Sequence, residues 1–183
     1  MKILLLGSKS TGKSSVLHSF YQRNFTPHPT IGIEVSSCLM KTPVRFYDMG
    51  GARYWWSWIH QYIKNTDLVF LFYDITEPKT LKEADEIMEI LKVKKNEFRI
   101  ILVGNKTDLE EQRKIDIFHI HDFVQKWRIE GILLSHIETS QYNTTAFKQV
   151  LKRVFKGMNR MRYFDQIDMK KSQGWGEYIF NWA

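Results

Sequence analysis

Apolar runs alternate with amphipathic stretches along most of the chain. The apolar runs have the length of β-strands, and the stretches between them repeat with the 3.6-residue period of helices. The predicted strands are Lys2–Leu6, Ile33–Met40, Val44–Asp48, Leu68–Asp74, Ile100–Gly104 and Ile132–Ile137. The predicted helices are Lys13–Arg23, Trp55–Ile63, Thr80–Val93, Ile117–Ile129 and Thr144–Met161. This alternation predicts an α/β fold, with a mostly parallel six-stranded sheet and helices on both of its faces.

Two short signals refine this pattern. Lys41-Thr42-Pro43 separates the second and third predicted strands and indicates a hairpin turn, which makes that pair antiparallel. Gly131 follows the fourth predicted helix and is expected to end it as a C-cap, because glycine readily adopts the left-handed conformation common at that position. The expected sheet is therefore parallel except for one hairpin.

The composition is that of an ordinary globular protein. The chain has 183 residues, of which 43% are hydrophobic and 26% are charged. Its one cysteine, Cys38, excludes an internal disulfide framework and fits a reducing cytoplasm. The longest wholly apolar run, from Leu68 to Tyr73, is far too short to span a bilayer. We predict a cytoplasmic protein with one main domain at residues 1–162 and an aromatic extension at residues 163–183.

Positive charge is concentrated near the C-terminus. The net charge is +7, and the segment from Lys148 to Lys171 contains eight cations but only two anions. Such a segment is usually the solvated outer face of a helix. The alternative is electrostatic attachment to an anionic surface, either a membrane or nucleic acid, although we expect no specific nucleic-acid partner. Peripheral contact with an anionic membrane surface thus stays open for this segment.

Residues 7–14 form a complete G-x-x-x-x-G-K-S phosphate-binding loop, with the sequence Gly7-Ser8-Lys9-Ser10-Thr11-Gly12-Lys13-Ser14. The loop lies between the first predicted strand and the first predicted helix, where backbone N–H groups and the helix dipole attract polyphosphate. Lys13 is expected to reach the outer phosphates, and the Ser14 hydroxyl is expected to ligate Mg²⁺. The chain is therefore predicted to bind a nucleoside polyphosphate.

Two segments later in the chain indicate which base is bound. Asp108, in the segment Asn105-Lys106-Thr107-Asp108, is placed to accept both N–H groups of the guanine Watson–Crick edge, while Asn105 meets the major-groove side. Adenine lacks this donor pair and would leave the carboxylate unpaired, at a cost of several kcal/mol. Glu138-Thr139-Ser140 follows the last strand and is expected to offer a backbone N–H to the guanine carbonyl. The predicted ligand is a guanine nucleotide.

Asp48-Met49-Gly50-Gly51 ends the third predicted strand. Asp48 is expected to hold Mg²⁺ through water, and the Gly51 N–H is expected to touch the γ-phosphate. Like the other motifs, this one lies at the C-terminal end of a strand or in the loop that follows. That edge is where an open α/β sheet binds its ligands.

These motifs, in this order, resemble those of the Ras superfamily of small GTPases over roughly residues 1–160. Pro29-Thr30-Ile31-Gly32 completes the set, because it resembles the first switch of that family, in which the threonine binds Mg²⁺ and the γ-phosphate. The resemblance implies a P-loop GTPase (G) domain that binds GTP or GDP with Mg²⁺. Its partners would be effectors, an exchange factor (GEF) and a GTPase-activating protein (GAP).

The resemblance also implies the individual contacts. The metal would be held by Ser14 and Thr30, and by Asp48 through water. Hydrolysis would depend on Lys13, Thr30 and Gly51. The residues expected to contact the nucleotide are Gly7, Lys9, Ser10, Thr11, Gly12, Lys13, Ser14, Ser15, Thr30, Gly51, Asn105, Lys106, Asp108, Leu109, Thr139, Ser140 and Gln141.

Within the superfamily the motifs point to different branches. The first-switch segment at residues 29–32 and the segment at residues 48–51 are similar to those of the Arf branch. Tyr73-Asp74-Ile75-Thr76 and the two guanine-binding segments are more similar to those of Rab and Ras proteins. The sequence therefore assigns no branch.

Two residues depart from the pattern of active family members. Ala52 stands where those members usually carry the glutamine that orients the attacking water, so unaided hydrolysis is expected to be slow unless His60 or a partner's side chain substitutes. Lys9 stands where Ras-like members often carry glycine. Three roles are open for Lys9: to neutralise transition-state charge in cis, to strengthen nucleotide binding from a solvent-exposed position, or to block an incoming arginine finger.

The segment that follows Gly51 corresponds, by the resemblance, to the second switch of the family. It is unusually aromatic, with Tyr54, Trp55, Trp56 and Trp58 within five residues. The three tryptophans spread around a helical turn, so they cannot all face the core. Exposed tryptophan is a frequent anchor in protein interfaces, which makes this patch a predicted effector surface. The alternative is that one or two of the rings pack beneath the switch and shape it.

Neither end of the sequence carries a lipidation signal, so we expect no lipid anchor of the protein's own. The sequence supports two functional hypotheses. The first is a signalling or trafficking switch that hydrolyses GTP slowly. The alternative is a nucleotide-locked scaffold or interaction module with negligible hydrolysis, which the alanine at position 52 favours.

Overall fold

The computed structural model describes residues 1–40, 43–93 and 98–158. Six strands form one sheet in the order β2-β3-β1-β4-β5-β6. The strands are β1 (Lys2–Gly7), β2 (Ile33–Leu39), β3 (Pro43–Met49), β4 (Leu68–Asp74), β5 (Arg99–Asn105) and β6 (Leu133–Glu138). The helices are α1 (Lys13–Phe20), α2 (Ile59–Tyr62), α3 (Pro78–Lys92), α4 (Ile117–Ile129) and α5 (Thr145–Met158), with 3₁₀ helices at Arg53–Trp58 (η1) and Thr107–Gln112 (η2).

The sheet is parallel except at one edge. β1 pairs in parallel with β3 and β4, β4 with β5, and β5 with β6, whereas β2 runs antiparallel to β3. The predicted fold class is therefore confirmed. The predicted hairpin turn includes Lys41 and Thr42, which lie outside the described residues, but the antiparallel pairing on either side of it is present.

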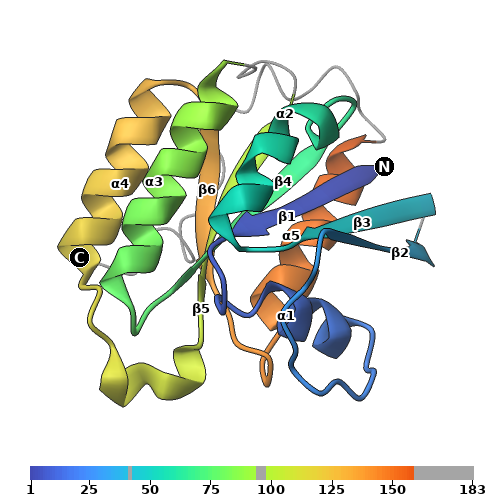
Figure 1. The fold of residues 1–183 in the computed structure, drawn as a ribbon, viewed down its shortest axis with the longest axis horizontal. Helices are drawn as coiled ribbons and strands as arrows, with labels where there is room; N and C mark the ends of the chain where they lie inside the picture. The colour runs from blue at the N-terminus through green and yellow to red at the C-terminus, as the bar shows by residue number, and fades with distance from the viewer. Residues whose placement is uncertain (41–42, 94–97, 159–183) are drawn as a thin grey trace.

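Each face of the sheet carries its own core, because alternate side chains of a strand point to opposite faces. Leu4 and Leu6 pack with α2, α3 and α4 on one face. Ile3 and Leu5 pack with α1 and α5 on the other. Figure 1 shows α3 and α4 side by side over one part of the sheet, and α1 next to the lower part of α5. β4 is buried along its whole length, which explains its continuous apolar run.

The ends of α3 and α4 show how far local sequence signals predict the bounds of a helix. α4 has the predicted bounds, with Asp116 capping its start by accepting a hydrogen bond from the His119 N–H at 3.0 Å. Gly131 follows its last turn at φ 73°, as expected of a C-terminal glycine. α3 begins two residues earlier than predicted, because Pro78 occupies the first turn and Glu77 caps it.

Two predicted helices need correction. The segment Trp55–Ile63 is not one helix: η1 covers Arg53–Trp58 and only one α-helical turn, α2, follows it. The aromatic side chains of this segment favour packing positions against the rest of the protein that a regular α-helix would not give them. The first helix ends at Phe20 rather than Arg23, since Gln22 has φ 56° and cannot continue a right-handed helix.

Within the described residues, no helix combines the length and the apolar character needed to cross a membrane. β1, β3, β4, β5 and β6 run in the same direction, so their carboxyl ends meet at one edge of the sheet. The ends of β1, β3, β5 and β6 and the loops that follow them contain four of the five motifs singled out in the sequence, and the fifth, at residues 29–32, leads into β2. The fold therefore collects these motifs at a single place.

Candidate nucleotide-binding site

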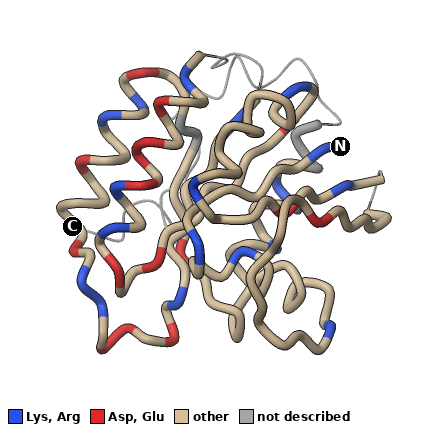
Figure 2. The backbone as a smooth tube through the Cα atoms, in the orientation of Figure 1, with Lys and Arg blue, Asp and Glu red and all other residues tan. Residues whose placement is uncertain are grey.

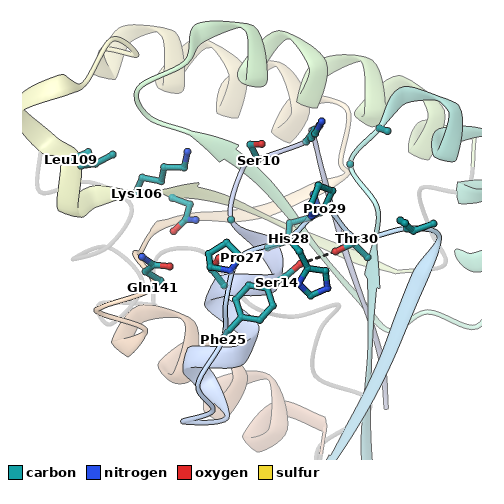
Figure 3. A pocket seen from close by; sticks show the side chains of 18 of the residues that line it. Ser10, Ser14, Phe25, Pro27, His28, Pro29, Thr30, Lys106, Leu109 and Gln141 are labelled. Carbon is teal, nitrogen blue, oxygen red and sulfur yellow. Dashed lines mark hydrogen bonds between the residues drawn. The ribbon is translucent and has the colours of Figure 1, made fainter.

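A cavity of about 550 Å³ lies at the carboxyl edge of the sheet. Its walls come from segments far apart in the sequence. Of the predicted nucleotide contacts it is lined by Lys9, Ser10, Gly12, Lys13, Ser14, Ser15, Thr30, Gly51, Asn105, Lys106, Asp108, Leu109 and Gln141. Figure 3 shows Lys106, Leu109 and Gln141 at one end of the cavity and Thr30, Pro29 and His28 toward the other. The cavity lining does not include Gly7, Thr11, Thr139 or Ser140.

The phosphate-binding loop is built by the backbone. Gly12 has φ 82°, and a side chain at this position would collide with the amide group of Asn105. The Asn105 Nδ2 group donates to the Thr11 carbonyl at 2.7 Å, and the Thr11 hydroxyl donates to the Ser8 carbonyl at 2.9 Å. The loop after β1 is thus fastened directly to the start of the predicted guanine-binding segment, 94 residues away.

Lys13 is buried within this loop, at 5% exposure. Its ammonium group donates to the carbonyl oxygens of Gly7 and Ser8, each at 2.9 Å. Burial lowers the pKa of Lys13 to about 8, although the nearby Asp48 carboxylate opposes that shift. The lysine is therefore held in place by neutral acceptors and retains its charge for an anionic ligand.

Three oxygen-bearing side chains meet beside Lys13. The Ser14 hydroxyl donates to Asp48 Oδ2 at 2.5 Å and lies 3.0 Å from the Thr30 hydroxyl, a contact drawn in Figure 3. Asp48 is 2% exposed, and its Oδ1 atom has no partner among the described residues. Burial raises the pKa of Asp48, while Lys13 and the Ser14 hydrogen bond act in the opposite direction. Hard oxygen donors around one carboxylate fit Mg²⁺, which binds few protein ligands and completes its shell with water and phosphate.

The two predicted switch segments touch each other at this site. The Gly50 N–H donates to the Gly32 carbonyl at 2.8 Å. A side chain on Gly50 would collide with the Thr30 carbonyl and with the Trp55 ring. The Trp55 ring also lies against Gly32. Both segments therefore share one packed contact, and a displacement of either one disturbs the other.

Gly51 lies directly against the phosphate-binding loop. A side chain on Gly51 would collide with the backbone of Ser8 and Lys9, so only glycine permits this approach. Ala52 follows Gly51 in the cavity wall and offers only a methyl group. His60, the side chain considered as a substitute for the missing glutamine, is exposed on α2 and does not line the cavity.

The opposite end of the cavity is formed by the segment after β5. Asn105 is 2% exposed, and its Oδ1 atom has no partner among the described residues. Lys106 has φ 71°, and its ammonium group pairs with Asp74 Oδ2 at 2.5 Å. Asp108 and Leu109 line the cavity, with Asp108 exposed. The predicted base-binding residues therefore lie together, and their guanine contacts stay a prediction.

Thr139 and Ser140 lie in the neighbouring loop rather than in the cavity wall. The Thr139 N–H donates to the Gly104 carbonyl at 2.8 Å, and the Ser140 N–H to the Asn143 carbonyl at 3.3 Å. The Ser140 hydroxyl accepts hydrogen bonds from the Tyr142 and Asn143 N–H groups. Gln141 is the residue of this loop that lines the cavity. The expected amide contact to the base from residues 138–140 stays a prediction.

An ion-pair network that the sequence did not indicate supports this end. Arg113 donates two hydrogen bonds to Glu138, at 3.0 and 2.7 Å, and two to Glu110, at 2.6 and 2.8 Å. Hydrogen bonds to Glu110 and Glu138 raise the pKa of Arg113. The guanidinium thus joins η2 to the end of β6. No sequence signal identifies which charged residue of a loop forms such an ion-pair network.

A tyrosine–histidine pair lies beneath the same loops, with Tyr73 buried and His136 partly buried. The Tyr73 hydroxyl, on the fully buried β4, lies 3.0 Å from His136 Nε2 on β6. Burial lowers the pKa of His136 to about 3, and the positive charges of Arg113 and Arg128 act in the same direction. Burial also raises the pKa of Tyr73 well above its usual value. Both groups are therefore neutral near pH 7, and a neutral hydrogen bond joins the phenol to the imidazole.

Sequence reasoning missed several residues of the loop between α1 and β2. Phe25, Pro27 and His28 line the cavity, and Figure 3 shows the Phe25 and Pro27 side chains beside α1. Phe25 stacks on His18, with ring centroids 4.1 Å apart. The available sequence signal for this part of the cavity was Phe25, an isolated aromatic residue among prolines and polar residues. Ile31 and Tyr54 are further lining residues that were not expected.

The aromatic second switch divides between core and surface. Trp56 is 7% exposed, Trp58 is 43% exposed and Tyr54 is 68% exposed. Trp55 is partly buried and lies edge-on to Trp58, with ring centroids 5.0 Å apart. Trp58 in turn stacks over Tyr62 at 6.3 Å. The three tryptophans do not all face the core, as the spacing predicted. The rings of Tyr54, Trp55 and Trp58 lie next to one another and form a continuous row of rings.

The basic C-terminal segment is only partly within the described residues. Its described side chains are Lys148, Lys152 and Arg153, all on α5. Residues 159–171, and with them the other cations beyond α5, lie outside the described part, as does the aromatic extension at residues 163–183. The boundary at residue 162 and the membrane contact therefore stay predictions.

Comparison with known proteins agrees with this geometry. The profile of the Ras family matches residues 2–160. Similar proteins include the Ras-related protein Rab-28 of Caenorhabditis elegans, with 31% identity over 129 residues, which covers 64% of this chain and 52% of Rab-28. Rab-11A of Dictyostelium discoideum is 27% identical over 87% of this chain and 78% of its own length. Human Rab-17 is 28% identical over 83% of this chain and 77% of its own length.

The family match covers nearly the residues over which the motifs resembled small GTPases, and it confirms that resemblance. The matched region spans about half of Rab-28 and about three quarters of the other two relatives. All three relatives carry Ras-related Rab names. The Arf-like character of the two switch segments stays a prediction.

Proposed function

This chain belongs to the Ras family, and on that premise we propose that it is a GTP-dependent molecular switch of the signalling or trafficking type. The observation that carries the proposal is a single cavity with two chemically different ends. One end presents Lys13 and a cluster of hard oxygen ligands, and the other presents Asn105 and Asp108. A guanine nucleotide matches both ends at once.

The base end selects guanine through its carboxylate. Asp108 accepts the two N–H groups of the guanine edge, and the Asn105 amide, one of whose N–H groups already donates to the Thr11 carbonyl, offers its second N–H group to the acceptors on the other side of the base. Binding adenine would leave the carboxylate without donors, which costs several kcal/mol. The discrimination therefore rests on one charged group in an exposed position.

At the phosphate end, the residues Ser14 and Thr30 would hold Mg²⁺, and Asp48 would hold it through water. When bound, the ion neutralises phosphate charge and orients the terminal phosphate. Lys13 neutralises the outer phosphates from its buried position, and its two carbonyl partners keep the ammonium group aimed at the loop. The Gly51 N–H and the Thr30 backbone contact the γ-phosphate.

Loss of the γ-phosphate removes the ligand contacts of Thr30 and Gly51 together. Because the Gly50 N–H also binds the Gly32 carbonyl, the two switch segments relax as a coupled unit. The energy for switching comes from the difference in contacts between the GTP and GDP states. No covalent intermediate with the protein is required.

Hydrolysis is slow in this proposal. The methyl group of Ala52 neither donates to nor accepts from water, so the attacking water is oriented less well than by a glutamine. A GAP supplies the missing group, and a GEF releases the product. Effectors bind the row of rings formed by Tyr54, Trp55 and Trp58, whose exposure changes when the second switch relaxes.

A second candidate function follows from the same alanine. A protein that hydrolyses GTP negligibly would be a nucleotide-locked scaffold, presenting its ring surface permanently. In either case the protein works in the cytoplasm, and the basic segment at residues 148–171 supports peripheral contact with an anionic membrane surface.

The first experiment is to denature freshly purified protein and identify the nucleotide that it releases. Bound GDP supports a switch that hydrolyses GTP, whereas bound GTP supports the locked scaffold. A Lys13→Met variant is the control and is expected to release little nucleotide, because its phosphate contact is lost. If the wild-type protein releases no guanine nucleotide and binds none when GTP and Mg²⁺ are added, the proposed function is wrong.

A further inference from the structure

Among the described residues, three lysines line the nucleotide cavity, and they are held differently. The Lys13 ammonium donates to the carbonyl oxygens of Gly7 and Ser8. The Lys106 ammonium pairs with Asp74. Lys9 is exposed, and no described residue accepts a hydrogen bond from its ammonium group or pairs with it. Two of the three charges therefore have protein partners, and the third is available to a ligand.

The position of Lys9 along the cavity is fixed by its backbone. The backbone N atom of Lys9 lies so close to Gly51 that a side chain on Gly51 would collide with this atom. Gly51 and Thr30 form the end of the cavity that senses the γ-phosphate in the proposed function. Among the described residues that line the cavity, the acidic one is Asp108, at the opposite end, while the buried Asp48 carboxylate at the phosphate end already accepts from Ser14. The Lys9 backbone is thus placed beside the segment expected to contact the γ-phosphate, the group that a diphosphate lacks.

We propose that Lys9 binds the γ-phosphate in the ground state and makes this protein prefer GTP to GDP, an inference that rests on the proposed function. The interaction is specific for the triphosphate because removal of the γ-phosphate leaves the ammonium group without an acceptor. A flexible lysine acts as a point charge rather than as the planar fork of an arginine finger. It therefore stabilises bound GTP without accelerating its hydrolysis.

This role complements the alanine at position 52. Ala52 slows the loss of the γ-phosphate, and Lys9 slows the loss of the whole triphosphate. Both effects act at the same end of the cavity, and both lengthen the GTP-bound state. A protein with this pair is biased toward its active conformation even before any regulator acts.

The test measures equilibrium affinities for GTP and GDP, each with Mg²⁺, in the wild-type protein and in Lys9→Met and Lys9→Arg variants. Lys9→Met is expected to weaken GTP binding by about tenfold, the effect of losing one charge-assisted hydrogen bond, and GDP binding by less than about twofold. Lys9→Arg is expected to retain the preference for GTP. Lys82→Met, an exposed lysine of α3 outside the nucleotide cavity, is the matched control and is expected to change neither affinity.

Three outcomes would overturn the inference. Equal losses for GTP and GDP would assign Lys9 to the inner phosphates. Unchanged affinities would mean that its ammonium group stays in solvent. A slower single-turnover hydrolysis with unchanged GTP affinity would assign it to the transition state instead. Because all three require a wild-type protein that binds guanine nucleotides, failure of the proposed function is recognised separately, as absence of binding by the wild-type chain.

Discussion

The base end and the phosphate end of the cavity are held together by different kinds of contact. At the base end, charged side chains bind each other: Lys106 pairs with Asp74, and Arg113 joins Glu110 to Glu138. At the phosphate end, the switch segments meet through neutral groups, namely the Gly50–Gly32 backbone hydrogen bond, the Trp55 ring and the Ser14 hydroxyl between Thr30 and Asp48, and Lys9 has no partner among the described residues. The base end is therefore held by ion pairs and the phosphate end mainly by neutral contacts.

Figure 2 shows the same contrast along the backbone. Charged residues of both signs mark α3 and α4, and acidic residues mark η2, while the loop from residue 21 to residue 32 carries one charged residue, Arg23. A region fixed by its own ion pairs can recognise a base by shape and charge. A region with few internal contacts can follow the presence or absence of one phosphate. The two ends therefore divide recognition from switching.

The largest expected effect breaks recognition at the base end. Asp108→Asn removes a charged acceptor of two N–H groups, so GTP affinity is expected to fall about a hundredfold. Xanthosine triphosphate carries a carbonyl where guanine has an amino group, and the new amide can donate to it, so its affinity is expected to rise. Calorimetric titration with both nucleotides measures the exchange. Glu111→Gln, a neighbouring exposed carboxylate outside the cavity wall, is the control. Unaltered GTP binding by Asp108→Asn would place the base elsewhere.

A smaller effect is expected from the ion pair that holds Lys106. Asp74→Asn keeps an oxygen to accept from Thr76 but removes the charge that faces Lys106, so nucleotide affinity is expected to fall about thirtyfold. The measurement is the dissociation rate of a fluorescent GDP analogue. Lys106→Met and the double variant are expected to match each other and to lose at least as much as Asp74→Asn, because Lys106 is also predicted to contact the nucleotide. Additive losses would show that Asp74 acts independently of Lys106.

At the phosphate end, Ala52→Gln is expected to accelerate hydrolysis. A glutamine able to hydrogen-bond the attacking water is expected to raise the single-turnover rate roughly tenfold, equivalent to about 1.4 kcal/mol of barrier. GTP affinity is expected to stay within about twofold, because the added group faces water rather than phosphate. Ala52→Leu has similar bulk without a hydrogen-bonding group and is expected to show no acceleration. Equal rates for the two variants would remove Ala52 as the cause of slow hydrolysis.

The smallest expected effect concerns folding at the base end. His136 has its pKa lowered from 6.5 to about 3, so the unfolded chain binds more protons below pH 6.5. Its contribution to stability is complete above pH 6.5 and is lost as the pH falls from there toward 3. Between pH 7 and pH 5 the free energy of unfolding is expected to fall by at most about 2 kcal/mol from this group.

Urea denaturation at the two pH values measures the loss. In His136→Gln the amide oxygen still accepts from Tyr73 but does not titrate, so most of the pH dependence is expected to disappear. His119→Gln, at an exposed histidine of α4, is the control and is expected to keep it. A wild-type stability that does not change between the two pH values would show that His136 is protonated without cost in the folded protein.

The local sequence predicted the buried strands well. β4 has the predicted bounds because a strand buried on both faces needs a continuous apolar run, and α4 does because Asp116 and Gly131 mark its ends. η1 and η2 were not predicted as such. Their short aromatic or charged segments carry no period, and their surroundings include contacts distant in the sequence, such as Trp55 with Gly50 and Arg113 with Glu138.

By itself, the sequence determined the fold class and the motif of the phosphate-binding loop, and it predicted most of the residues that line the cavity. Those features depend on apolar period, on glycine positions and on motifs read within a few residues. Only the tertiary structure decided how these residues are held. It paired Lys106 with Asp74, and it left Lys9 exposed beside Gly51. Partners of this kind lie tens of residues apart, and a charged side chain acquires its role only from the groups that the fold brings to it.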